Sequence, residues 1–164
     1  MDIKFKKYMN PRYIICAMID SNYIDLHSLI EWADTMINSI DVPKDWLFLI
    51  SLGSDINNVN YDIRCCLSNE NILDHEIIDS LFIGFSYIRY KNGEVNINEL
   101  DKILSGYFVF NKNLFNEDDL YTYFYHPKSN PNLINSINSE FVRCECISKK
   151  AIEYFYSNKV INEI

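Results

Sequence analysis

The chain of 164 residues is most simply one domain, residues 1–164, because two domains would each lie near the smallest size that buries a stable core. A composition of 48% hydrophobic and 23% charged residues, with four glycines and four prolines, excludes a disordered or collagen-like chain. The net charge of −8 argues against non-specific binding of nucleic acid, which requires a basic surface.

The sequence predicts neither a membrane span nor an export signal. No window approaches 18 consecutive apolar residues, so we expect no membrane span and no membrane partner. The apolar run of residues 13–19 is too short for a signal peptide and precedes no cleavage site of small residues. Five cysteines, an odd number, are typical of reduced thiols in the cytoplasm. We therefore predict a cytoplasmic protein.

Residues 21–41 show the clearest helical pattern. Ser21 or Asn22 is the expected N-cap, and Pro43 follows the expected end. The apolar side chains fall within one arc of about 160°, which is wide enough to contact more than one neighbour: Leu26, Leu29, Ile30, Trp32, Ala33, Met36, Ile37 and Ile40. The opposite arc is polar: His27, Ser28, Glu31, Asp34, Thr35 and Asn38.

A second, almost wholly apolar helix is predicted over residues 44–52, with Pro43 in its first turn. Its composition predicts that it is buried. Residues 53–60, rich in Gly, Ser, Asp and Asn, are a predicted loop. Residues 61–68 favour a short helix over a strand.

Residues 74–90 predict a strong helix. Asp74, Glu76 and Asp79 favour the positive dipole end, and Arg89 and Lys91 complement the other end. Gly84 allows another backbone to approach closely, and Asn92-Gly93 is expected to end the helix in a left-handed cap. The predicted core stripe consists of Ile77, Ile78, Leu81, Phe82, Phe85 and Ile88.

Shorter helices are expected in the last third. Asn96 or Asn98 caps a helix through Leu104 that Gly106 stops, and residues 107–115 are ambiguous. Further helices are predicted over residues 117–125, 133–142 and 149–157, the last capped by Ser148, with a loop at 126–132 and a frayed tail from 158. The pattern predicts an all-α fold, a compact single-domain bundle of six or seven short helices.

No residue pattern declares a catalytic, cofactor or metal site. The adjacent Cys65 and Cys66 do not complete a zinc site with Cys144 and Cys146, because structural zinc ligands prefer paired spacing. Of the three histidines only His126, in a loop, is a candidate base, and glycine-rich phosphate loops are absent. The aromatic run of residues 121–125 fits either an interface or core filling. We therefore predict no catalytic residue, cofactor or metal ligand.

The charge distribution is more informative. Residues 1–12 hold one acid and four bases, or +3, and residues 13–88 hold twelve acids and two bases, or −10. Residues 89–164 hold ten acids and nine bases, or −1. An acidic face can serve solubility alone, or it can steer association with a basic protein. For the second case the candidate partner-binding residues are Glu31, Asp34, Asp41 and Asp45.

Two segments resemble a known family. Residues 29–37 (LIEWADTMI) and 41–52 (DVPKDWLFLISL) are similar to a W-A-D-x-x-I … P-x-W-L-x-x-L-S-L pattern of small helical immunity proteins from bacterial polymorphic-toxin systems. Residues 81–95 (LFIGFSYIRYKNGEV), followed by Glu99-Leu100, resemble that group's next helices. The resemblance covers the first two-thirds of the chain. It implies a non-catalytic protein that neutralises a cognate, basic toxin domain.

Two other classes stay open. A Bcl-2-like host-interaction protein of an AT-rich virus shares the acidic, Ile- and Asn-rich composition, and a hydrophobic groove for a partner helix would mark it. An enzyme with an unrecognised site would show a deep cavity with convergent polar groups. The sequence does not predict the oligomeric state.

Overall fold

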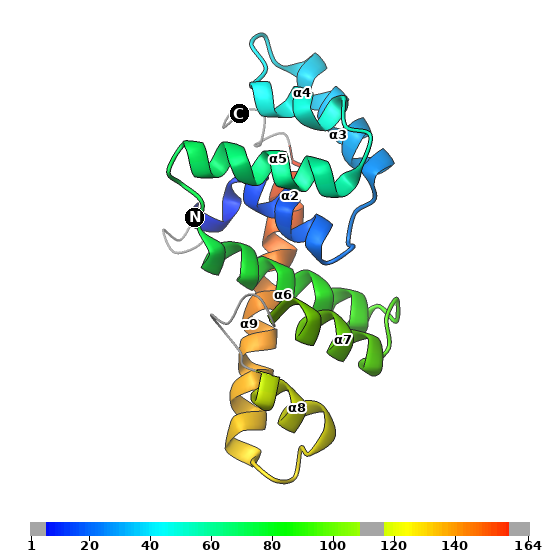
Figure 1. Cartoon of the computed structure of the whole chain (residues 1–164), viewed down its shortest axis with the longest axis vertical. Helices are drawn as coiled ribbons and strands as arrows, with labels where there is room; N and C mark the ends of the chain where they lie inside the picture. Colours follow the sequence, from blue (N-terminus) through cyan, green and yellow to red (C-terminus); the bar gives the residue numbers. More distant parts are fainter. Residues whose placement is uncertain (1–5, 109–116, 158–164) are drawn as a thin grey trace.

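The computed structural model describes residues 6–108 and 117–157, and this part of the chain is all-helical, with no strand. It contains eight α-helices and one short 3-10 helix (Figure 1). The elements are η1 (Lys7–Met9), α2 (Pro11–Asp20), α3 (Leu26–Ser39), α4 (Asp45–Ser51), α5 (Ile56–Asn69), α6 (His75–Lys91), α7 (Ile97–Phe108), α8 (Glu117–Tyr125) and α9 (Pro131–Phe155).

Acidic side chains begin three of these helices. The carboxylates of Asp25, Asp55 and Asp74 accept hydrogen bonds from backbone amides in the first turns of α3, α5 and α6. Such caps satisfy amides that have no partner within the helix. The predicted cap of α3 at Ser21 or Asn22 is therefore wrong: Ser21 is the C-cap of α2, and Asn22 takes the left-handed conformation in the following turn.

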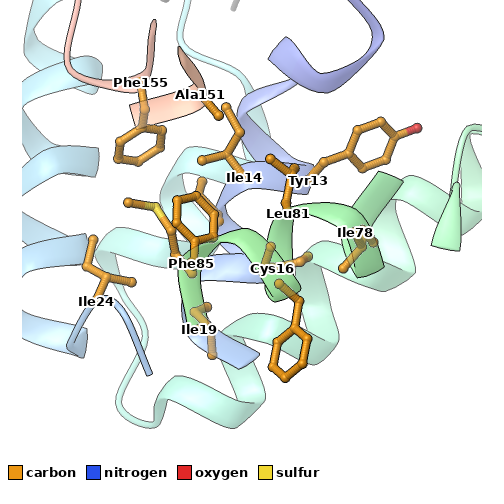
Figure 2. Packing of buried hydrophobic residues seen from close by; sticks show 14 of the residues in the cluster. Tyr13, Ile14, Cys16, Ile19, Ile24, Ile78, Leu81, Phe85, Ala151 and Phe155 are labelled. Carbon is orange, nitrogen blue, oxygen red and sulfur yellow. The ribbon is translucent and has the colours of Figure 1, made fainter. Parts of the chain in front are cut away.

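The core lies where α2, α6 and α9 meet. α9 runs along the long axis of the molecule and crosses α6, while α2 packs on α6 (Figure 1). Figure 2 shows side chains of the three helices in this core, among them Ile14 of α2, Leu81 and Phe85 of α6, and Ala151 and Phe155 of α9. All six residues of the stripe predicted for residues 74–90 are buried, which confirms that helix and its orientation.

The close approach expected at Gly84 is confirmed. A Cβ added there would lie 2.7 Å from the carbonyl carbon of Cys144 in α9, and closer still to the carbonyl oxygen. The hydroxyl of Ser148 donates a hydrogen bond of 3.1 Å to the Leu81 carbonyl across the same crossing. Only a residue without a side chain lets the two backbones come this close.

The first predicted helix packs as expected. In α3 the side chains of Leu29, Trp32, Ala33 and Met36 are buried. Every residue of the predicted polar arc is solvent-exposed. The Trp32 ring stacks on Phe155 at 4.2 Å between ring centroids and faces Trp46 at 6.3 Å. α3 and α4 are thereby attached to the end of α9, at one end of the molecule (Figure 1).

Several predicted boundaries are wrong. Residues 11–20 form α2 although no element was predicted there, and α5 begins inside the predicted loop at residue 56. Gly106 does not stop α7, which continues to Phe108. Pro43 is not in the first turn of α4 as predicted, because the N-cap of that helix is Lys44. The ambiguous residues 109–115 and the predicted tail lie outside the described residues.

The two predicted C-terminal helices are one. α9 continues for 25 residues through Ser148, which is buried in the helix interior and bonded to α6. The all-α class is confirmed, and the prediction of six or seven helices is close to the eight α-helices of the described residues. Among the described helices, none combines the length and apolarity needed to cross a bilayer.

Candidate functional site

The four predicted partner-binding residues lie on α3, on α4 and on the segment between them. Glu31 and Asp34 are on the polar arc of α3, one turn apart, while Asp41 precedes α4 and Asp45 is its first residue. All four side chains are exposed. The antiparallel pair α3 and α4 therefore brings the four carboxylates onto one part of the molecule.

The four carboxylates differ in their partners. The Glu31 carboxylate lies 3.2 Å from His27 Nε2, and Asp34 accepts a hydrogen bond from the Ser51 hydroxyl at the end of α4. Among the described residues, Asp41 and Asp45 have no ion-pair or hydrogen-bond partner. Asp34 thus helps to hold α4 on α3, while Asp41 is available to a partner. Asp45 also lies in the first turn of α4, where the helix dipole favours a negative charge.

The outer face of α4 is apolar, and the prediction that this helix is buried is wrong for that face. Phe48 and Leu49 are 40% and 38% exposed, Leu52 is 82% exposed, and Val42 in the preceding segment is 80% exposed. At about 100° per residue, positions 45, 48, 49 and 52 share one arc of about 100°. The opposite arc of α4 supplies the buried residues Trp46, Leu47 and Ile50.

We call this region the α4 surface: Val42, Phe48, Leu49 and Leu52, with the acids Glu31, Asp34, Asp41 and Asp45. The bond from Ser51 places Asp34 beside the C-terminal end of α4, and Asp41 and Asp45 lie at its N-terminal end. A helix of seven residues is about 10 Å long. The apolar side chains therefore form a short strip with carboxylates at both ends.

Half of the twelve acids in residues 13–88 have structural roles that the charge count did not reveal. Asp20 pairs with Arg64, Glu70 pairs with Arg12, and the fully buried Asp79 accepts a hydrogen bond of 2.7 Å from the Tyr107 hydroxyl. Asp25, Asp55 and Asp74 are helix caps. The prediction that Asp79 lies in the first turn of α6 and favours its dipole is wrong, because Asp79 lies beyond that turn and is buried. The charge that remains for a partner is concentrated at the α4 surface, with Asp62 and Glu76 elsewhere.

The aromatic run of α8 divides between core and surface. Tyr123 and Phe124 are half-buried, and the Tyr123 ring meets Phe141 of α9 edge to face at 5.4 Å. Burial raises the pKa of Tyr123 to about 12. Tyr121 and Tyr125 are exposed, and His126 lies 3.4 Å from the Tyr121 hydroxyl without a carboxylate in the described residues to orient it. Core filling is therefore confirmed for Tyr123 and Phe124, while an interface at Tyr121 and Tyr125 stays a prediction.

The cysteines do not converge. Cys16 and Cys144 are buried, and burial raises the pKa of each thiol to about 12. Cys146 is exposed on α9, while Cys65 and Cys66 are half-buried on α5. In residues 6–108 and 117–157, no group of three His, Cys, Asp or Glu side chains is arranged to hold a metal ion.

Of the features above, the apolar side of the α4 surface is the one that sequence reasoning missed. The signal was present, since positions 45, 48, 49 and 52 share one face and Asp45 is incompatible with burial there. Searches of protein-family models, curated proteins and solved structures found no match to this chain.

Proposed function

We propose that this protein is a non-catalytic binding protein that neutralises a basic toxin domain, and that the α4 surface is its binding site. One observation carries the proposal: α4 and its C-cap Leu52 turn three large apolar side chains outward, between exposed carboxylates at both ends of the helix. Exposed apolar residues with a polar rim are typical of protein interaction sites.

The two parts of the α4 surface have different roles. The apolar residues supply affinity, because each Å² of apolar surface removed from water contributes about 25 cal/mol, and this is the main gain on association. The carboxylates supply attraction over a distance and selectivity for a basic partner. A stable interface covers about 800 Å² per partner, so the polar arc of α3 is included in the proposed contact.

The resemblance to immunity proteins supports the same region. The segments 29–37 and 41–52, which carry the first part of that resemblance, cover most of α3, most of the connection and the whole of α4. They include all eight residues of the α4 surface. A toxin that acts on nucleic acid has a basic active face, which complements this acidic one. A bacterial, cytoplasmic setting belongs to this proposal.

The first experiment tests the apolar side chains. The product of the adjacent gene, as the candidate toxin, is co-expressed with the protein, and growth and the Kd of the purified pair are measured. We expect wild type to restore growth and Val42→Ser/Leu52→Ser to weaken binding about tenfold or more, since central apolar contacts dominate interfaces. Both positions are highly exposed, so the variant should fold. Val142→Ser, at an exposed apolar position of α9, is the matched control and should bind like wild type.

The second experiment tests the charges. Glu31→Lys/Asp41→Lys avoids Asp34, which bonds Ser51, and Asp45, in the first turn of α4. We expect association to slow by about tenfold or more at low salt, and the difference to shrink at about 0.5 M salt because the Debye length falls to several ångströms. An unchanged on-rate would remove the carboxylates from the encounter. Failure of the adjacent gene product to inhibit growth, or of this protein to relieve the inhibition, would refute the immunity function.

A further inference from the structure

A cavity of about 510 Å³ lies next to the α4 surface, on the side of the α2 N-terminus. The side chains that matter for its chemistry are Lys6, Asn10, Arg12, Lys44, Trp46 and Glu70. They come from the start of the described chain, from α2, from the beginning of α4 and from the end of α5. The volume is within the range of small-molecule sites, about 300–1,000 Å³.

The charge of this cavity is opposite to that of the protein. Lys6, Arg12 and Lys44 contribute three positive charges and Glu70 one negative charge, which gives +2 in a chain of net charge −8. Three separate segments, residues 6–12, residues 44–46 and Glu70, must fold together to assemble this lining, so it is not a property of one basic stretch alone. A phosphate monoester carries a charge of about −1.5 to −2 at pH 7, which matches this lining better than a single carboxylate does.

Arg12 is the fixed element of the cavity. Its side chain is 10% exposed. The guanidinium carbon lies over the Trp46 ring, 6.0 Å from the ring centroid. Both terminal nitrogens donate to the Glu70 carboxylate, at 2.7 and 2.8 Å. Arginine has five N–H donors, and among the described residues its side chain bonds only Glu70. The geometry is that of an arginine holding an oxyanion, with donors to spare.

Glu70 occupies the arginine in the way a ligand would. It is the first residue after α5, and its side chain is 53% exposed. The hydrogen bonds from Arg12, together with the charges of Arg12 and Lys44, hold the pKa of Glu70 below its usual value against the opposing effect of partial burial. Glu70 is therefore ionised at neutral pH, and a carboxylate at the edge of the cavity can move out toward solvent when a more highly charged anion arrives.

We propose that this cavity binds the phosphate group of a small phosphate-bearing molecule, with Arg12 and Lys44 as the main ligands and Glu70 as an internal competitor. Lys6 and the Asn10 side chain are at the same cavity and complete the polar lining. The cavity is larger than a phosphate ion, and Trp46 lines the remaining space. This site is independent of the proposed toxin-binding function, since it uses none of the residues of the α4 surface.

The test measures binding of inorganic phosphate and of phenyl phosphate to the full chain by isothermal titration calorimetry at pH 7.5 and constant ionic strength. We expect Glu70→Gln to tighten binding and Lys44→Gln to weaken it, each by about tenfold, because each changes one charge next to the anion. Lys102→Gln, at an exposed lysine of α7, is the matched control and should bind like wild type. Lys44 is an N-cap without a side-chain cap bond, so its replacement should leave α4 intact.

The two probes distinguish the sources of the phosphate group. Tighter binding of phenyl phosphate would support an organic phosphate that also contacts Trp46, and equal binding would support free phosphate. No saturable binding of either probe to wild type or Glu70→Gln would overturn the proposal. Equal effects of Lys44→Gln and Lys102→Gln would also overturn it, because binding would then reflect general charge attraction.

Discussion

Replacing Gly84 by alanine tests the helix crossing on which the core depends. Alanine is favoured over glycine inside a helix by about 1 kcal/mol, so propensity alone predicts stabilisation. At position 84, however, the added Cβ would meet the backbone of Cys144 and the Ser148 side chain. A backbone neighbour cannot rotate away, so α9 must retreat from α6 by about 1 Å, which sacrifices much of the packing between the two helices.

The magnitude follows from these contributions. Overpacking costs about 1–3 kcal/mol, and a rigid backbone neighbour favours the upper end of that range. Loss of the Ser148 hydrogen bond to Leu81 adds about 1 kcal/mol, and helix propensity returns about 1 kcal/mol. We therefore expect Gly84→Ala to lower the free energy of unfolding by about 3 kcal/mol.

Gly106→Ala is the matched control, because a Cβ there has no neighbour within 4 Å and the residue lies within α7. It should stabilise the protein by up to about 1 kcal/mol. Urea unfolding is followed by the fluorescence of Trp32 and Trp46 and by circular dichroism at 222 nm. The two glycine substitutions should have opposite signs. A Gly84→Ala variant at least as stable as wild type would refute the close crossing of α6 and α9.

Two further predictions concern the same scaffold. Trp32→Ala removes the stack on Phe155 and should cost about 3–5 kcal/mol in urea unfolding; a loss below about 0.5 kcal/mol would show that α3 does not pack through this face. Burial alone would raise the pKa of Glu145, but its bonds to Lys149 and Lys91 outweigh burial and lower it. A lowered folded pKa means that the stabilisation is present above the usual value of 4.5 and lost as pH falls through the folded value. The difference in the free energy of unfolding between wild type and Glu145→Gln should therefore be constant near neutral pH and shrink on acidification. Urea unfolding from pH 7 to 3 measures this difference, and a pH-independent value would contradict the lowered pKa of Glu145.

Helical periodicity predicted α3, which has one wet and one dry face. It also predicted the stripe of α6, because Asp79, Ser80 and Ser86 interrupt the apolar residues, although these polar residues are buried as well. Periodicity failed for α2, in which nine of the ten residues are buried, and for the helix boundaries. A helix buried on all sides has no polar face and therefore no period, and a serine such as Ser148 looks like a cap until its partner on α6 is known.

The acidic residues show the same division at the candidate site. Composition and charge counting determined that residues 13–88 carry the excess of negative charge, and the helical pattern placed Glu31 and Asp34 on an exposed face. Only the tertiary structure decided which acids are caps, which are paired and which are free, because a carboxylate at a helix start and one facing solvent look alike in a sequence.

The sequence by itself determined the all-α class, the helices α3 and α6 and the acidic character of the first half. The tertiary structure decided that α4 is buried on one side only, that Asp79 lies in the interior and that Lys6, Arg12 and Lys44 surround one cavity. The physical reason is that an apolar side chain favours burial, but whether it is buried depends on how many neighbours the fold packs against it. α4 has neighbours on the side of Trp46, Leu47 and Ile50, and its other side is left to solvent or to a partner.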